Sequence, residues 1–134
     1  MENKMNEYNA LEIKNLSKEY PHFRLDRLNL TLPGGCIMGL VGENGAGKST
    51  TIKLLLNMIH RDSGTITILG RDNRNDLSVL KEEIGVVLDD VGLPECLKAG
   101  QIGKVMKGIF KSWDDVEYEK YLRRLSIPTD RKYK

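Results

Sequence analysis

A glycine-rich segment carries the pattern G-x-x-x-x-G-K-[ST], which binds phosphate groups; it reads Gly42-Glu43-Asn44-Gly45-Ala46-Gly47-Lys48-Ser49. Glycines let the backbone curl, so that successive N–H groups point inward at phosphate oxygens. A helix that begins near Lys48 adds the positive end of its dipole at the same point. In this pattern Lys48 reaches the β- and γ-phosphates, while the hydroxyl of Ser49 ligates Mg²⁺. Thr50 can donate a further hydrogen bond, and the segment therefore predicts a site for the phosphates of a nucleotide.

The segments on either side of this loop have the character that the loop requires. Residues 36–41 (CIMGLV) form a short, continuous apolar run, which is typical of a strand buried on both faces of a parallel sheet. A helix is predicted from about residue 48 to residue 59. The side chains expected to face the sheet are Leu54, Leu55, Met58 and Ile59. A glycine-rich turn without a ligand is the alternative, and the flanking strand and helix argue against it.

Further strands and a short helix are predicted around the loop. Residues 10–16 and 26–32 alternate apolar and polar side chains, as half-buried strands do, and residues 65–69 are rich in β-branched side chains. Residues 84–88 (IGVVL) read as another buried strand. A helix is predicted over 73–83, with Asp76 as its candidate cap.

The last third of the chain has helical periodicity. Apolar side chains recur on one helical face, at Ile102, Val105, Met106, Ile109, Phe110 and Trp113. Ser112 with Asp115 resembles a capping box for a second helix. The apolar face of that helix comprises Tyr118, Tyr121, Leu122 and Leu125. Both faces can pack on neighbouring elements or bind a partner, and packing is the more common use.

The composition is that of an ordinary soluble protein with one domain. The 134 residues are 40% hydrophobic and 30% charged. A net charge of +2, from 21 basic against 19 acidic side chains, gives no case for a nucleic acid partner. Cys36 and Cys96 are far apart and are expected to be reduced thiols. No apolar run approaches the ~20 residues that span a membrane, so a membrane would be reached only through a partner.

Several segments together resemble the first half of the ATP-binding domain of ABC transporters. They are LSKEY at 16–20, LTLPGGCIMGLVGENGAGKSTTIKLLLNMI at 30–59 and DSGTITILG at 62–70. The resemblance implies an α/β fold of the P-loop NTPase type with an N-terminal antiparallel β-subdomain, of which the chain holds a part. We expect a flexible tail over 1–9, the P-loop and β-subdomain core over 10–96, and the start of the helical subdomain over 97–134.

The resemblance also assigns a ligand and its contacts. The expected ligands are ATP and Mg²⁺. An aromatic side chain upstream of the P-loop stacks on adenine in this family, and Tyr20 is the candidate, with Phe23 as the fallback. The expected nucleotide-binding residues are Tyr20, Gly42, Glu43, Asn44, Gly45, Ala46, Gly47, Lys48, Ser49 and Thr50.

One position departs from the family pattern. The segment KEEIGVVLDD at 81–90 lies where the family has a glutamine that contacts Mg²⁺ and couples the ATP site to the transmembrane partner, and this chain has Asp89 there. Aspartate is also an oxygen ligand, so Ser49 and Asp89 are the predicted metal ligands. Aspartate variants, and the segment 112–134, resemble the bacterial exporter branch of the ABC-2 type.

A rival interpretation uses the same acidic pair. An apolar run that ends in Asp89-Asp90 also fits the Mg²⁺-binding Walker B strand of a small, self-contained P-loop kinase or NTPase. The segment DSGTITILGRD at 62–72 matches an ABC strand and turn and favours the ABC interpretation.

The resemblance further implies what this chain does and what it contacts. The chain ends at Lys134, before the expected signature motif and catalytic glutamate, so we expect ATP binding with negligible hydrolysis and assign no catalytic residue. The expected partners are a transmembrane permease and a second nucleotide-binding domain, at the cytoplasmic face of the cell membrane. Without a later central strand beside it, the apolar strand 36–41 has a bare edge, and we expect the chain to self-associate.

Overall fold

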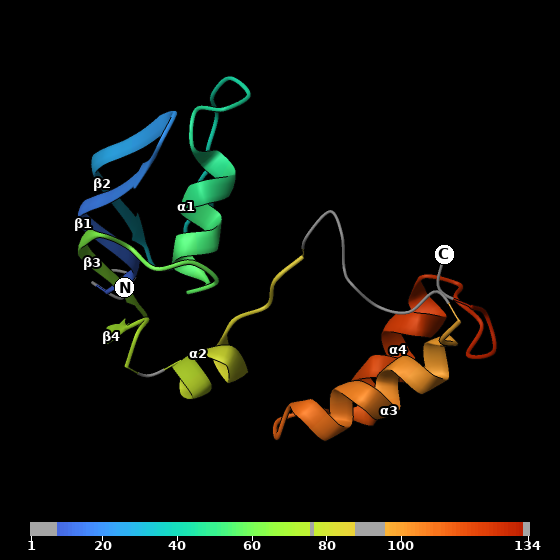
Figure 1. Ribbon diagram of the computed structural model, residues 1–134. Coiled ribbons are helices and arrows are strands. Elements are labelled where there is room, and N and C mark those ends of the chain that lie inside the picture. The colour runs from blue at the N-terminus through green and yellow to red at the C-terminus, as the bar shows by residue number, and fades with distance from the viewer. Residues whose placement is uncertain (1–7, 76, 88–95, 133–134) are drawn as a thin grey trace. The chain divides into compact units, whose positions relative to one another are not determined.

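The computed structural model describes residues 8–75, 77–87 and 96–132, and the chain divides into two compact units, of which the first ends at Leu80. The elements in chain order are β1 (Asn9–Tyr20), β2 (Phe23–Pro33), α1 (Lys48–Leu55), β3 (Ser63–Ile68), β4 (Arg71–Asp72), α2 (Leu77–Glu83), α3 (Ala99–Ile109) and α4 (Asp115–Arg124) (Figure 1). Asp76, Asp89 and Asp90, for which the sequence predicts roles, lie outside the described residues.

The first unit is built on a four-stranded antiparallel sheet in the order β2-β1-β3-β4. Strands β1 and β2 form a long hairpin in which Tyr20 faces Phe23 across the turn Pro21-His22. The strands predicted over 10–16, 26–32 and 65–69 are confirmed, because their alternating apolar side chains form the inner face of this sheet.

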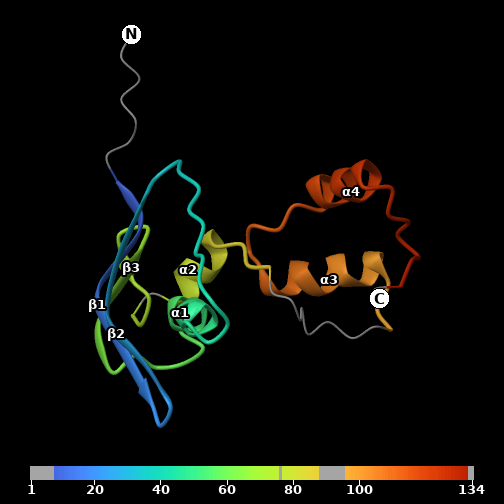
Figure 2. The same ribbon diagram turned by 90° about the horizontal axis from the view of Figure 1, so that it is seen from above.

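The core of the first unit lies between the sheet and α1, which lies against the sheet in both views (Figures 1 and 2). The buried apolar cluster of this core consists of Ile13, Leu16, Leu54 and Ile66. Leu55 and Ile59 pack against this cluster, as predicted, whereas Met58 is 58% exposed. Helix α1 ends at Leu55, before the predicted end at residue 59, because Asn57 takes a left-handed conformation with φ 52°.

Two predicted strands are not formed. Residues 36–41 and the described part of 84–88 have no regular secondary structure and no sheet pairing, and Ile37, Val41 and Val87 are almost fully exposed. The prediction was wrong because a parallel strand requires a neighbouring strand that donates and accepts its hydrogen bonds. None of the described residues provides such a neighbour, so an apolar run alone does not make a strand here.

The predicted helix over 73–83 begins only at Leu77. Asn73 and Arg74 are instead bonded to the P-loop helix and to the segment that follows it. Local helical periodicity is therefore outweighed by tertiary hydrogen bonds at these positions.

The second unit begins at Lys81 and contains α3 and α4, which meet at a close contact. A Cβ atom at Gly103 would lie 2.7 Å from the Tyr118 ring, so only glycine allows this approach. The Tyr118 hydroxyl donates to the carbonyl of Ala99 at 2.8 Å, and burial raises its pKa. The Trp113 ring lies 4.9 Å from the Tyr118 ring, between centroids. The apolar faces of both helices thus serve, at these positions, for packing.

The start of α4 differs from the predicted capping box. The N-cap is Asp114, whose carboxylate accepts from the backbone N–H groups of Val116 and Glu117 at 2.8 and 3.0 Å. Ser112 instead donates to the Glu82 carboxylate at 3.3 Å. Asp115 pairs with Lys107, and this ammonium, together with the Trp113 N–H, keeps the pKa of Asp115 below its ordinary value.

No helix among the described residues has both the length and the apolar character needed to cross a bilayer.

A pair of glycines tests the packing of the sheet. Gly64 has φ +86°, and a Cβ atom there would lie 2.4 Å from the carbonyl oxygen of Asn15 in β1. Gly70 has a similar φ of +77° but open space around it. We expect Gly64→Ala to lower the free energy of unfolding by roughly 3 kcal/mol, and Gly70→Ala by about 1–2 kcal/mol, since only the first also displaces a strand. Urea unfolding followed by circular dichroism measures both, and equal losses would contradict the steric argument.

Candidate phosphate-binding site

The glycine-rich loop is shaped by left-handed backbone positions. Gly45 and Gly47 have φ +88° and +98°, values that other residues rarely adopt. The N–H of Ala46 donates to the carbonyl of Glu43 at 3.1 Å, which closes a turn inside the loop. Gly47 is the N-cap of α1, so the helix begins at Lys48, as predicted. The loop therefore presents backbone N–H groups and a helix N-terminus on one side.

Thr51 fastens the loop to the helix. Its N–H and its hydroxyl both donate to the carbonyl of Gly47, at 2.8 and 2.9 Å, and its side chain is buried. The first turn of α1 therefore cannot rotate away from the loop without breaking buried hydrogen bonds.

The Lys48 side chain reaches back across the loop. Its ammonium donates to the carbonyl oxygens of Gly42 and of Glu43, the latter at 2.7 Å. The positive charge thus lies over the concave side of the loop. Ser49 is exposed beside it, and Thr50 is half-buried. These positions agree with binding of a polyphosphate by charge and by hydrogen bonds.

A cleft of about 480 Å³ joins this loop to the turn of the β1–β2 hairpin. The lining residues are Tyr20, His22, Phe23, Asn44, Gly45, Gly47, Lys48, Ser49 and Thr50. The structure thus brings Tyr20 together with most of the predicted phosphate-binding residues, whereas Gly42, Glu43 and Ala46 do not line the cleft. His22 was not among the predicted binding residues, and its place in the tight turn next to Tyr20 was the available signal.

The two aromatic candidates have different surroundings. A Cβ atom at Gly47 would lie 2.8 Å from the Phe23 ring, so Phe23 packs directly against the loop. Tyr20 is 40% exposed, and its ring centroid lies 6.5 Å from that of Phe23. Phe23 therefore supports the loop, and Tyr20 is the more exposed of the two rings.

The residues present fit a magnesium ion that is held mainly by phosphate oxygens. The exposed Ser49 hydroxyl lines the cleft beside Lys48. Among the described residues there is no group of three His, Cys, Asp or Glu side chains that could hold a metal without a phosphate. Mg²⁺ usually keeps several waters and takes few protein ligands when it binds together with a nucleotide. A single hydroxyl ligand from the protein is therefore consistent with such a site. Asp89, the other predicted ligand, lies outside the described residues.

A buried polar network holds the far end of α1. The Asn73 amide donates to the carbonyls of Leu54 and Leu55 at 2.8 and 2.9 Å. Its oxygen accepts from Arg61 at 2.6 Å, and Arg61 also pairs with Asp72 at 2.9 Å. Asn73 is 1% exposed. The network therefore bonds the last carbonyls of α1 and connects this helix to β4 at the edge of the sheet.

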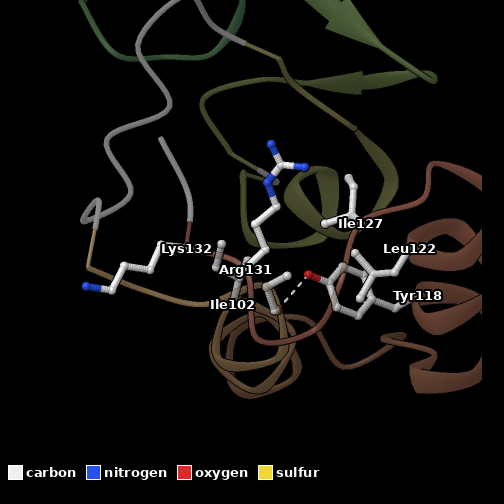
Figure 3. A pocket seen from close by; sticks show the side chains of 7 residues that line it. Ile102, Tyr118, Leu122, Ile127, Arg131 and Lys132 are labelled. Atoms are coloured by element: carbon white, nitrogen blue, oxygen red, sulfur yellow. Dashed lines mark hydrogen bonds between the residues drawn. The ribbon is translucent and has the colours of Figure 1, made fainter.

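A larger hollow lies in the second unit, between α3, α4 and the segment that follows them (Figure 3). It measures about 650 Å³, and its lining residues are Ala99, Ile102, Tyr118, Leu122, Ile127, Arg131 and Lys132. Arg131 and Lys132 extend away from the Tyr118 ring, whose hydroxyl is already bonded (Figure 3). The hollow thus lacks the convergent polar groups that the first cleft has, which makes the loop the stronger candidate.

Comparison with known proteins connects this geometry to a family. The family model described as "ABC transporter" matches residues 25–134. The "Galactose/methyl galactoside import ATP-binding protein MglA" of Treponema denticola is 43% identical over 87 residues, which make up 63% of this chain and 18% of that protein. The "Daunorubicin/doxorubicin resistance ATP-binding protein DrrA" of Streptomyces peucetius is 36% identical over 100 residues, 74% of this chain and 30% of that protein.

A solved structure shares the fold. A chain described as "Structure of ATP binding subunit of ABC transporter" superimposes with a TM-score of 0.78 at 26% identity, covering 92% of this chain and 54% of that one. The chain thus spans about half of this solved subunit and less than a third of the two curated relatives.

The buried amide of Asn73 gives a test of the network. Asn73→Ala removes the amide that bonds two helix carbonyls and one nitrogen of the buried Arg61 guanidinium, and we expect the free energy of unfolding to fall by roughly 2–4 kcal/mol. The control is Asn75→Ala in the exposed turn nearby, which should cost less than about 0.5 kcal/mol. Urea unfolding followed by circular dichroism compares the two. Equal stability of both variants would show that the network does not hold the helix.

Proposed function

Because residues 25–134 match its family model, this chain belongs to the ABC transporter family, and we propose that it binds ATP as part of a transporter's ATP-binding subunit. One observation carries this proposal: a single cleft holds the P-loop, with Lys48 and Ser49, and an exposed aromatic ring, Tyr20. A nucleotide has a polyanionic end and a planar apolar end, and the cleft offers a matching surface for each.

Each part of the cleft has a task in this proposal. The N–H groups of the loop and the start of α1 bind the phosphates, and the Lys48 ammonium moves from the loop carbonyls to phosphate oxygens. The Ser49 hydroxyl and the phosphates hold Mg²⁺. The Tyr20 ring stacks on adenine, a contact that tolerates different bases because every base has an aromatic face.

We further propose that this chain binds ATP without appreciable hydrolysis. Phosphoryl transfer requires a group that orients the attacking water in addition to the phosphate cradle. The described residues that line the cleft include no carboxylate, and His22 is their only titratable base apart from Lys48 and Tyr20. A test is phosphate release by the purified chain with Mg²⁺ and ATP.

The proposed setting is a bacterial exporter of the ABC-2 type, with a transmembrane permease and a second nucleotide-binding domain as partners, at the cytoplasmic face of the membrane. The similarity to a drug-resistance ATP-binding protein supports export, and the similarity to a galactose-import protein makes import the alternative. The domain boundary between residues 96 and 97 remains a prediction. A self-contained kinase or NTPase that uses Asp89-Asp90 is less well supported, because the family match extends across most of the chain.

Two lysines of the same helix test ATP binding. Lys48→Ala removes the charge over the loop, whereas Lys53→Ala changes an exposed lysine at the other end of α1. We expect Lys48→Ala to weaken ATP affinity roughly 10- to 100-fold, the effect of one charge-assisted hydrogen bond, and Lys53→Ala to change it less than about 2-fold. Titration calorimetry with Mg²⁺ and ATP measures both. Absence of saturable binding by the wild-type chain would refute the proposal.

We also propose that the chain self-associates through residues 36–41. Ile37 and Val41 have exposed fractions of 102% and 94%, and the segment is apolar and unpaired, so it can pair with another strand edge. Sedimentation should show a mass that rises with protein concentration. Ile37→Lys should suppress this rise, whereas Val116→Lys, a change at an exposed valine of α4, should not. A monomer at all concentrations would exclude self-association.

A further inference from the structure

Lys18 of β1 is an unusual lysine for the surface of a sheet. Its side chain is only 18% exposed, although lysine is almost always solvated. Its ammonium lies 5.4 Å from the centroid of the Tyr20 ring, over the ring, and 2.8 Å from a carboxylate oxygen of Asp62. One lysine thus contacts both the proposed base-stacking ring and an acidic partner from a distant part of the chain.

Asp62 holds more than the ammonium. Its second carboxylate oxygen accepts from the backbone N–H of Glu19 at 2.7 Å, and its own N–H donates to the carbonyl of Ser17 at 3.0 Å. Glu19 lies between Lys18 and Tyr20 in the strand. Asp62 therefore holds both the Lys18 side chain and the backbone next to Tyr20. The hydrogen bond from Lys18 is also the main reason why the pKa of Asp62 lies below its ordinary value.

The ammonium restricts how the ring can be used. A cation over an aromatic face is attracted by the negative charge of that face. While it lies there, no other planar group can stack on the same face. Tyr20 stands at the end of β1 and is 40% exposed, and its ring centroid also lies 6.5 Å from that of Phe23. With one face covered by Lys18, the opposite face is the one on which a base can stack.

We propose that Lys18, held by Asp62, is a positioning residue for the base of the nucleotide: it covers one face of Tyr20 and orients the other face toward the base. The inference rests on the proposed ATP binding. Lys18 does not line the cleft and is not proposed to contact phosphate. Its effect must therefore pass through the ring, and it must depend on the presence of a base.

An ordinary surface ion pair is the simpler interpretation of Lys18 and Asp62. Exposed pairs contribute little to stability, and their loss would not distinguish one ligand from another. The two interpretations therefore differ in one measurable quantity, namely how much more tightly the protein binds ATP than inorganic tripolyphosphate, which carries the same phosphates without a base.

The experiment is titration calorimetry of the full chain with ATP and with inorganic tripolyphosphate, both with Mg²⁺. We expect Lys18→Met to weaken ATP about 3- to 10-fold, the range of a cation–π contact, and to change tripolyphosphate less than about 2-fold. Lys18→Arg should restore ATP affinity, since a guanidinium also lies over aromatic rings. The matched control is Lys14→Met, a change in the same strand at a lysine that pairs with Glu12 at 3.1 Å and is 62% exposed; it should leave both affinities unchanged.

Two further variants test whether Asp62 holds Lys18 in place and whether Lys18 acts through the Tyr20 ring. Asp62→Asn keeps an oxygen that can accept from the Glu19 N–H but removes the charge that holds Lys18, and it should also weaken ATP selectively. In the Tyr20→Ala background, Lys18→Met should have no further effect on ATP, because the ring through which it acts is gone.

The outcomes separate the two proposals. Equal weakening of ATP and tripolyphosphate by Lys18→Met, or no weakening of either, would overturn the positioning role. Wild-type binding of tripolyphosphate as tight as that of ATP would also overturn it, while leaving phosphate binding intact. If the wild-type chain binds neither ligand, ATP binding itself fails, and the positioning role fails with it.

Discussion

The direction of α1 is the constraint on which the candidate site depends. Its first turn is fastened to the loop by Thr51, and its last carbonyls are bound by the buried amide of Asn73. Leu54 packs the same helix against the sheet, in the buried cluster with Ile13 and Ile66. Since the N–H groups that we propose to bind phosphate belong to the loop and the first turn, any tilt of the helix would redirect them. The geometry of the proposed site thus depends on a side chain at the far end of the helix.

The antiparallel sheet contributes the other half of the cleft. A tight turn at Pro21-His22 ends the β1–β2 hairpin, and the residues that flank it, Tyr20 and Phe23, both reach the loop. Phe23 fills the space beside Gly47, whereas Tyr20 is 40% exposed and has the Lys18 ammonium over one face of its ring. The hairpin therefore carries two rings in different settings: Phe23 packs against the loop, and Tyr20 is the ring that we propose to stack on the base.

A structural feature could be predicted from the sequence when a few neighbouring residues determine it, and was missed when distant residues determine it. The loop and the start of α1 were predicted because glycine spacing and helix capping act within a few residues. The strand over 36–41 was predicted wrongly because pairing depends on a neighbour, which hydrophobicity cannot reveal. Ser112 was chosen as a cap where Asp114 caps α4, an error of two positions between similar side chains. The link from Lys18 to Asp62 was missed because these residues are 44 positions apart, and only the fold brings them together.

The contact between Trp113 and Tyr118 has a consequence for spectroscopy. Trp113 is the only tryptophan of the chain, and it lies in the second unit, with its indole N–H bonded to Asp115 at 3.0 Å. Its ring is 4.9 Å from that of Tyr118, close enough to accept excitation energy from it. Intrinsic tryptophan emission therefore reports on the packing of α3 and α4. The sheet and the cleft contain tyrosine and phenylalanine but not this tryptophan, so the unfolding of the first unit must be followed by a different optical signal.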